Sequence, residues 1–402
     1  MNVIVFTSAM VEEEFAKYQK EAHIKPNPSN QNFYDKLIKA LSFKNNVSVV
    51  SHRPFVKGMF DDDVLQAKQT SDGKVKYYYT RLEATRSYKL FDEAEEIIAA
   101  GEKAALDFSG EPFICVVDTL RVNLVKGAIK FARKFNAKIV GVLTDNPANL
   151  SLIRRSYVKN VYRNAQRLDA FLALSNGLLR VFKVSEKPNY VFEGLVDEVP
   201  LMQKKPIGNY YFFGGSLYER YGVKRLINAF LDSNIPEKIV IAGNGPLQDY
   251  IFQNTEKNLR LLYLAQLPIN QIYCLEQHAI ANINPRPFSK KMDDESVPSK
   301  LLEYLSSGVP TISTIHSKLY EIFKNDVYWI EDDTTIGIKN ALNNFATQDY
   351  EEMMKRAIAA RVKVYEIYGL KNQGERIAYF LTSISSWFNN STSFLLVKFS
   401  SK

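Results

Sequence analysis

Residues 282–310, which read NINPRPFSKKMDDESVPSKLLEYLSSGVP, indicate a strand, a polar loop and a helix in succession. The apolar run 280–283 is typical of the end of a buried strand, and 285–297 is too polar and too interrupted by proline to continue it. A helix is predicted from Pro298, because proline suits the first helical position and Gly308 suits the end. This order places a ligand at the carboxyl edge of an α/β sheet.

The predicted helix has an apolar and a polar face. At 100° per residue, its apolar side chains lie opposite its polar ones: Leu301, Leu302 and Leu305 against Ser299, Glu303 and Ser306. Free N–H groups near 296–300 would present partial positive charge to a phosphate.

Two acids frame the start of this helix. Glu295 and Glu303 are separated by seven residues, the first before the helix and the second on its polar face. Together with the helix N-terminus they indicate a site for an anion and a polyol. The alternative is that both are solvated, Glu295 as the end of the acidic run 293–295 and Glu303 on an exposed helix face.

The spacing Glu295-x7-Glu303, followed by Gly308-x-Pro310, resembles the E-x7-E signature of retaining GT-B glycosyltransferases of the family 4 type. The run NPRP…PSKLLEYLSSGVP is also similar to bacterial transferases that build surface polysaccharides. The resemblance covers 209–332 well and the preceding residues weakly. It implies an α/β fold, GT-B, in which two doubly wound Rossmann-like domains face each other across a cleft.

The resemblance implies a retaining hexosyltransferase that moves a sugar from a nucleotide-sugar donor, expected to be a UDP-sugar, to a glycan, lipid-linked or protein-linked acceptor. The setting it implies is bacterial surface polysaccharide or glycoconjugate synthesis. In such enzymes the first acid, here Glu295, contacts donor-sugar hydroxyls, and the second, here Glu303, grips the ribose. Two alternatives stay open: a nucleotide-sugar epimerase of the same fold, and a non-catalytic partner of another transferase.

The loop Gly214-Gly215-Ser216 departs from the family pattern, which has Arg at position 216 and Lys at position 221. Another cation must then meet the donor diphosphate, and Arg220 is nearest in sequence. The residues expected to bind the donor are Gly215, Ser216, Arg220, Lys224, Gln266, Arg286, Ser296, Val297, Ser299, Lys300 and Glu303. No cofactor or metal is expected, because cations and a helix N-terminus can neutralise the phosphates.

Short apolar runs alternate with helical stretches along the whole chain, which predicts parallel sheets covered on both faces. We expect an acceptor-binding domain at 1–196 and a nucleotide-sugar-binding domain at 209–370. The proline-containing segment 194–209 is predicted to link them. A final helix at 373–388 is expected to pack back onto the first domain, as it does in similar proteins.

Polar residues follow several strands of the first domain, where a sheet edge would present them to a cleft. The acceptor-side candidates are Asn30, Asn32, Asp118, Arg121 and Asn146, and Asp145 joins Glu295 as a catalytic candidate because family members place a hydroxyl-contacting group nearby. Asn30 and Asn32 equally suit caps of a helix that starts near 32. Asp and Asn are also common turn residues, so each has a structural alternative.

Composition sets wider limits. The 402 residues suffice for two domains, and 52 basic against 44 acidic residues give a net charge of +8, which permits an anionic partner.

A helix over 150–168 carries basic residues at four-residue intervals, so it is either a solvated face or a contact with anionic membrane. No leader or membrane-span pattern is present, which predicts a cytoplasmic protein, with peripheral membrane contact at the inner face as an option, and no nucleic-acid partner. Cys115 and Cys274 are predicted to be buried free thiols.

Overall fold

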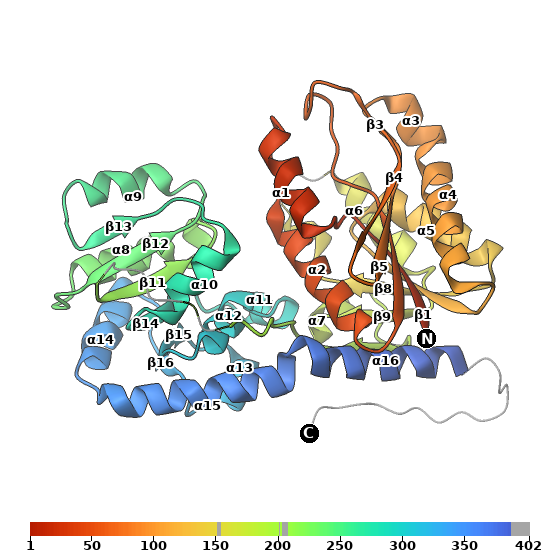
Figure 1. Cartoon of the computed structure of the whole chain (residues 1–402). Coiled ribbons are helices and arrows are strands. Elements are labelled where there is room, and N and C mark those ends of the chain that lie inside the picture. Colours follow the sequence, from red (N-terminus) through yellow and green to blue (C-terminus); the bar gives the residue numbers. More distant parts are fainter. Residues whose placement is uncertain (151–153, 201, 203–207, 387–402) are drawn as a thin grey trace. The chain divides into compact units, whose positions relative to one another are not determined.

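The computed structural model describes residues 1–150, 154–200, 202 and 208–386. They form two compact units (Figure 1). The first unit contains Met1–Leu195, Asp294–Ser296 and the chain from Leu370 onward, and the second contains Val196–Asp293 and Val297–Gly369.

The first unit is built on an eight-stranded sheet. Its strands are β1 (Asn2–Thr7), β2 (Asn46–Ser51), β4 (Lys68–Asp72), β5 (Val75–Tyr79), β7 (Phe113–Asp118), β8 (Lys138–Leu143), β9 (Ala170–Ala173) and β10 (Asn189–Val191). The order is β10-β9-β8-β7-β1-β2-β5-β4, and β4 runs antiparallel to β5 while the other pairs are parallel. The chain moves outward in one direction from β1 and in the other from β7, so the switch point lies between these two strands.

Helices cover both faces of this sheet. They are α1 (Glu12–Glu21), α2 (Pro28–Ser42), α3 (Arg86–Phe91), α4 (Glu93–Ala105), α5 (Val122–Lys134), α6 (Arg155–Ala165), α7 (Asn176–Val181) and α16 (Leu370–Ser386), with the 3-10 turns η1 (Leu106–Phe108) and η2 (Pro147–Asn149) and a small pair, β3 (Val64–Leu65) and β6 (Leu82–Glu83). Successive residues of β1 alternate between the faces: Val3 and Val5 join the core under α1, α2 and α16, whereas Ile4 and Phe6 join the core under α4, α5 and α6.

The last helix belongs to the first unit, where α16 packs along α2 (Figure 1). The contact is close, since a Cβ added to Gly374 would lie 2.1 Å from the Ala40 carbonyl oxygen. At the same contact, Glu375 pairs with Lys44 at 3.0 Å. The helix was predicted at 373–388; it starts earlier, at Leu370, and 387–388 lie outside the described residues.

The second unit has a six-stranded, fully parallel sheet of order β13-β12-β11-β14-β15-β16. Its elements are β11 (Tyr210–Gly214), η3 (Glu219–Tyr221), α8 (Val223–Leu231), β12 (Lys238–Ala242), α9 (Gln248–Thr255), β13 (Leu261–Tyr263), α10 (Ile269–Gln277), β14 (Ala281–Asn284), α12 (Ser299–Ser307), β15 (Thr311–Thr314), α13 (Ser317–Phe323), β16 (Tyr328–Ile330), α14 (Thr335–Ala346) and α15 (Tyr350–Tyr368). The short helix α11 (Lys290–Glu295) crosses the boundary between the units. The switch point lies between β11 and β14. The predicted α/β class with two doubly wound, Rossmann-like sheets is thus confirmed.

The helix predicted after residue 298 is α12, which ends at Gly308 with φ of +77° in the left-handed region that glycine tolerates. Its leucines Leu301, Leu302 and Leu305 are buried, as the helical periodicity predicts. Ser306 was assigned to the opposite, polar face, and this was wrong: it is 3% exposed, and the Tyr365 hydroxyl of α15 bonds its carbonyl oxygen. The helical periodicity of α12 alone could not reveal that α15 covers this side too.

Three local expectations were wrong, and one hairpin was missed. The segment 285–297 is not all loop, because it contains α11. The helix near 32 starts at Pro28 and is capped by Asn27, whose side chain accepts from the Ser29 N–H, so neither Asn30 nor Asn32 is the cap. The helix expected over 150–168 is the shorter α6, and 151–153 lie outside the described residues. The hairpin of β4 and β5 was missed, although its Asp72-Gly73 turn is a hairpin signal.

Cys115 and Cys274 are buried free thiols, as predicted. Within the described ranges, none of the helices combines the length and the apolar character needed to cross a bilayer.

Candidate functional site

The second unit brings three loops together at the carboxyl edge of its sheet. Gly222 has φ of +80°, and a Cβ there would lie 1.9 Å from the Pro285 carbonyl oxygen, so the loop after β11 packs on the residue that follows β14. Gly243, after β12, approaches the Gly215 carbonyl oxygen equally closely, with a distance of 1.8 Å for an added Cβ. Only glycine fits these two positions, and the edge they form lies at the switch point, where α/β sheets bind ligands.

Tyr304 fastens α12 to this edge. Its buried hydroxyl accepts the Gly214 N–H at 2.9 Å and donates to the Gly214 carbonyl oxygen at 3.2 Å. The N-terminal turn of α12 therefore has a fixed position beside the loop after β11. Lys300 lies in that turn, and its Cε would be 3.8 Å from a Cβ on Gly215. The structure thus brings Lys300 to the glycine-rich loop.

Lys300 forms an ion pair with Glu303, with Nζ 2.6 Å from Oε2. Burial alone would lower the pKa of Lys300, but the charges of Glu303 and Glu276 outweigh it and hold the pKa well above its usual range. Glu276, on α10, is 1% exposed. Sequence reasoning missed it, because it stands in an apolar helix with no motif around it. The edge therefore carries an ammonium group that is paired with Glu303 and also acted on by the charge of Glu276.

The other cations predicted for the donor contact aromatic rings or a backbone carbonyl of the second unit. Arg220 is exposed and lies over the rings of Tyr218 and Tyr221, at 4.9 and 5.0 Å from their centroids. Lys224 lies over the Tyr250 ring at 5.4 Å. Arg286 donates to the Met292 carbonyl oxygen at 3.2 Å, and burial lowers the pKa of its guanidinium.

The remaining donor candidates differ in exposure. Ser216, Gln266 and Ser299 are exposed, the first two in the loops after β11 and β13 and the third at the start of α12. Val297 is half-buried against the apolar cluster of α12. Ser296 is half-buried and groups with the first unit.

Glu295 also groups with the first unit, where it is 8% exposed. Its Oε2 accepts hydrogen bonds from the Nδ2 atoms of Asn146 and Asn149, at 2.9 and 2.7 Å. Asn146 in turn caps η2 through its Oδ1, which accepts the Ala148 N–H at 2.9 Å. Asn146 therefore has both the cap role and a bond to the predicted catalytic acid. Asp145, the other catalytic candidate, is exposed after β8.

Three of the acceptor-side candidates meet at the switch point of the first unit. Asn30 donates to Asp118 at 3.2 Å and accepts from the Ser8 hydroxyl at 2.8 Å. That hydroxyl also accepts from Arg121 at 2.9 Å, so Asn30, Asp118 and Arg121 form one network across the ends of β1 and β7. Burial raises the pKa of Asp118, and the charge of Arg121 partly opposes this. Asn32 is exposed on α2 and does not line the pocket described next.

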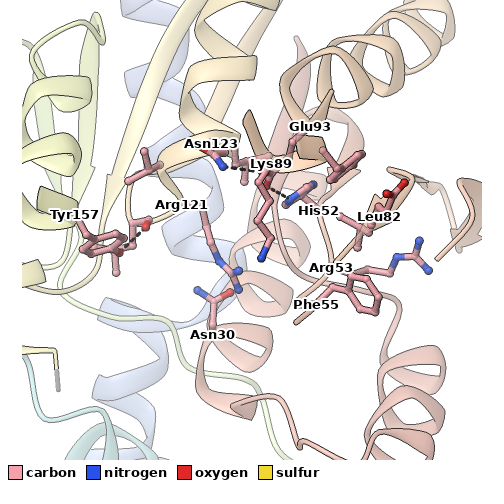
Figure 2. Close-up of a pocket in the computed structure, with 15 residues that line it drawn as sticks. Asn30, His52, Arg53, Phe55, Leu82, Lys89, Glu93, Arg121, Asn123 and Tyr157 are labelled. Atoms are coloured by element: carbon pink, nitrogen blue, oxygen red, sulfur yellow. Dashed lines mark hydrogen bonds and ion pairs between the residues drawn. The ribbon is translucent and has the colours of Figure 1, made fainter. Parts of the chain in front are cut away.

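Beside this network the first unit has a pocket of about 530 Å³ (Figure 2). Asn30 and Arg121 line it, and the rest of its wall comes from the segments after β2 and after β7 and from β6, α3, α4, α5 and α6. His52 forms part of the wall: its Nε2 lies 2.7 Å from Glu93 Oε1 and its Nδ1 lies 2.9 Å from the Thr80 hydroxyl. Asn123 donates to the other Glu93 oxygen at 2.6 Å.

His52, Lys89 and Glu93 line this pocket and were not predicted. His52 follows β2 directly, and the rule that functional groups follow strand ends, already applied to Asp118 and Asp145, would have found it. Lys89 and Glu93 come from helices brought in by tertiary packing. Among the described residues, no group of three His, Cys, Asp or Glu side chains is placed to hold a metal ion.

Residues 202–363 match the family model described as glycosyl transferases group 1, which covers most of the second unit. No curated protein matches the chain in sequence.

Solved structures resemble the whole chain in fold. Sucrose-phosphate synthase from Thermosynechococcus elongatus is 12% identical with a TM-score of 0.67, over 96% of this chain and 100% of that one. Anabaena HepE in complex with UDP is 13% identical with a TM-score of 0.62, over 95% and 100%. An E. coli structure described as trehalose-6-phosphate bound with UDP-2-fluoro glucose is 10% identical with a TM-score of 0.62, over 96% and 99%. These likenesses confirm the GT-B fold.

Proposed function

We propose that the protein is a glycosyltransferase that binds a UDP-sugar at the carboxyl edge of the second unit and transfers the sugar with retention of configuration. The observation that carries the proposal is the Lys300–Glu303 pair beside the Gly215 loop, at the switch point of the sheet and inside the segment that matches glycosyl transferases group 1. Structural neighbours support the choice of nucleotide, because HepE was solved with UDP and with UDP-glucose.

In this proposal the two members of the pair have different tasks. The Glu303 carboxylate accepts hydrogen bonds from the ribose hydroxyls, which are the strong, charge-assisted kind. The Lys300 ammonium, held beside the glycine-rich loop, meets the negative charge that gathers on the diphosphate as it leaves. Backbone N–H groups of that loop and of the start of α12 complete the phosphate contacts.

Glu295 is proposed to hold the donor sugar by its hydroxyls and so to fix the anomeric carbon against the acceptor. Its bonds from Asn146 and Asn149 would orient the carboxylate before substrate binds. The acceptor is proposed to be a glycan, lipid-linked or protein-linked chain. The resemblance of 282–310 to transferases of bacterial surface polysaccharide synthesis favours that setting.

The test starts from the full chain and a panel of UDP-sugars screened by thermal shift, because a ligand that binds the folded state raises the melting temperature. We expect one UDP-sugar to stabilise the protein, to release UDP only with an acceptor and to give a product with the donor's anomeric configuration by NMR. An isomerised donor without acceptor would instead mean an epimerase. Donor binding with turnover only after a second protein is added would mean a non-catalytic partner.

A further inference from the structure

The pocket of the first unit has an unequal arrangement of charge. Two acids line it, and both are satisfied by other side chains: Glu83 pairs with Arg81 at 2.7 Å, and Glu93 holds His52 and Asn123. Burial raises the pKa of Glu93, but the bond and charge of His52, the bond from Asn123 and the charge of Lys89 together outweigh burial and lower the pKa overall. Both acids therefore already have bonded partners, and the charge of Lys89 acts on Glu93 less strongly than His52 and Asn123 do.

Three cations line the same pocket, and one of them serves the fold. Arg53 is 6% exposed, and its Nη2 donates to the carbonyl oxygens of Gln66 and Thr80 at 2.8 and 3.0 Å. Its guanidinium also lies over the Tyr79 ring, 5.2 Å from the centroid. Figure 2 shows this guanidinium turned away from the amino group of Lys89.

The other two cations point into the pocket (Figure 2). Lys89 is exposed at the end of α3, and in the described part of the chain no carboxylate lies within 4.0 Å of its ammonium. Arg121 donates to the Ser8 hydroxyl, a neutral group, and Asp118, on which its charge acts, is fully buried and already bonded to Asn30 and to the Leu120 N–H. Two positive groups therefore face one space of about 530 Å³, the size of a small-molecule site.

The rest of the wall suits a sugar. Phe55, Leu82 and Tyr88 give apolar surface, and the side chains of Asn30 and Asn123 also line the pocket. Both nitrogens of His52 are occupied by Thr80 and Glu93, so His52 shapes the wall and does not act as a base. Nothing in this wall requires a neutral ligand, whereas the two cations favour a negative one.

We propose that this pocket binds the acceptor and that the acceptor carries an anionic group, a phosphate or a carboxylate, that Lys89 and Arg121 neutralise. The assignment of the ligand as acceptor rests on the proposed function; the preference for an anion rests on the pocket alone. Arg121 is suited to hold two oxygens at once through its planar guanidinium, and Lys89 adds a mobile point charge.

The experiment compares three probes of one sugar on the full chain at equal ionic strength: glucose 6-phosphate, glucuronate and glucose, with inorganic phosphate as a fourth. Calorimetry is run on wild type, on the double variant Lys89→Met, Arg121→Met, and on a control double variant, Lys103→Met, Lys126→Met, which removes two exposed lysines of α4 and α5 outside the pocket. UDP is titrated into all three proteins.

We expect one or both anionic sugars to bind wild type and the control at least tenfold more tightly than glucose does, and the pocket variant to lose that preference. The stronger of the two identifies the group as phosphate or carboxylate. Equal binding of glucose, no binding of either anionic sugar, or equal binding of inorganic phosphate without the sugar would overturn the inference. UDP affinity is expected to be unchanged in the pocket variant. If neither wild type nor either variant binds UDP, the proposed function is wrong. The sugar titrations then still show whether the pocket prefers an anionic ligand.

Discussion

The ammonium of Lys300 lies 2.6 Å from the carboxylate of Glu303, three residues later on α12. Their side chains are 33% and 18% exposed, so the pair is shielded from water without being sealed off from a ligand. A pair of this kind at a helix surface contributes only about 0.3–0.5 kcal/mol to stability. Its position beside Gly215 therefore matters more for binding than for folding, and this makes its two members separately testable.

Lys300→Met should weaken binding of the diphosphate and spare binding of the nucleoside. Loss of a charged hydrogen bond costs roughly 1.5–3 kcal/mol, so UDP affinity should fall by about ten- to a hundredfold while uridine affinity stays near wild type. Lys291→Met, at an exposed lysine of α11, is the matched control. If UDP and uridine weaken equally, Lys300 does not contact the phosphates, and Arg220 and Arg286 become the next variants to test.

Glu295→Gln should reduce transfer and leave UDP affinity close to wild type, because the proposed partner of Glu295 is the sugar. The amide also turns one acceptor oxygen into a donor facing Asn146 and Asn149, which disturbs the position of the side chain. The control is Asp294→Asn, at an exposed acid paired with Arg180. Steady-state rates are compared with calorimetric UDP affinities; equal losses in both would mean that Glu295 serves the nucleotide.

Glu93→Gln should destabilise the protein at neutral pH by about 1–3 kcal/mol, since the buried bond to His52 loses its charged acceptor. The pKa of Glu93 is lowered from its usual 4.5, so its contribution is complete above that pH and is lost as the pH falls through the lower folded value. The melting temperatures of wild type and variant should therefore converge below pH 4.5. A difference that is constant from pH 7 to pH 4 would contradict this.

Gly374→Ala tests how tightly α16 is held in the first unit. The added Cβ would lie 2.1 Å from the Ala40 carbonyl oxygen, and a backbone atom cannot move away cheaply, so we expect a loss of about 1–3 kcal/mol in urea unfolding. Glu375→Ala on the same helix removes only the exposed pair with Lys44, with an expected loss below about 1 kcal/mol. Equal losses in the two variants would mean that α16 does not pack closely on α2.

Much of the fold could be predicted because apolar strands alternate with helices. All six strands of the second sheet and six of the eight in the first coincide with apolar runs. The two that were missed form the β4–β5 hairpin, whose outer strand KQTSD is almost wholly exposed and shows no apolar run. Burial on both faces makes a strand visible in a sequence, and an exposed edge strand lacks that signal.

The candidate site was predictable where it follows strand ends and motifs, and not where it depends on packing. Asn30, Asp118 and Arg121 meet because parallel strands end at one edge. Glu276, by contrast, acts on Lys300 through its charge from another helix, and nothing in its local sequence marks it. The contacts of the cations likewise needed coordinates: Arg220, which is nearest in sequence, lies over the Tyr218 ring, and Lys300, also among the predicted donor residues, lies beside Gly215.

The central claim, a nucleotide site at the sheet edge of the second unit, is tested most directly by titrating UDP into wild type and Glu303→Ala by calorimetry. Each hydrogen bond from a ribose hydroxyl to the Glu303 carboxylate is expected to contribute roughly 1.5–3 kcal/mol to binding. We predict one UDP bound per wild-type chain and an affinity at least tenfold weaker in the folded variant. If folded Glu303→Ala binds UDP with wild-type affinity, Glu303 is a solvated residue of the helix face and does not bind the donor. That result would contradict the proposed donor site.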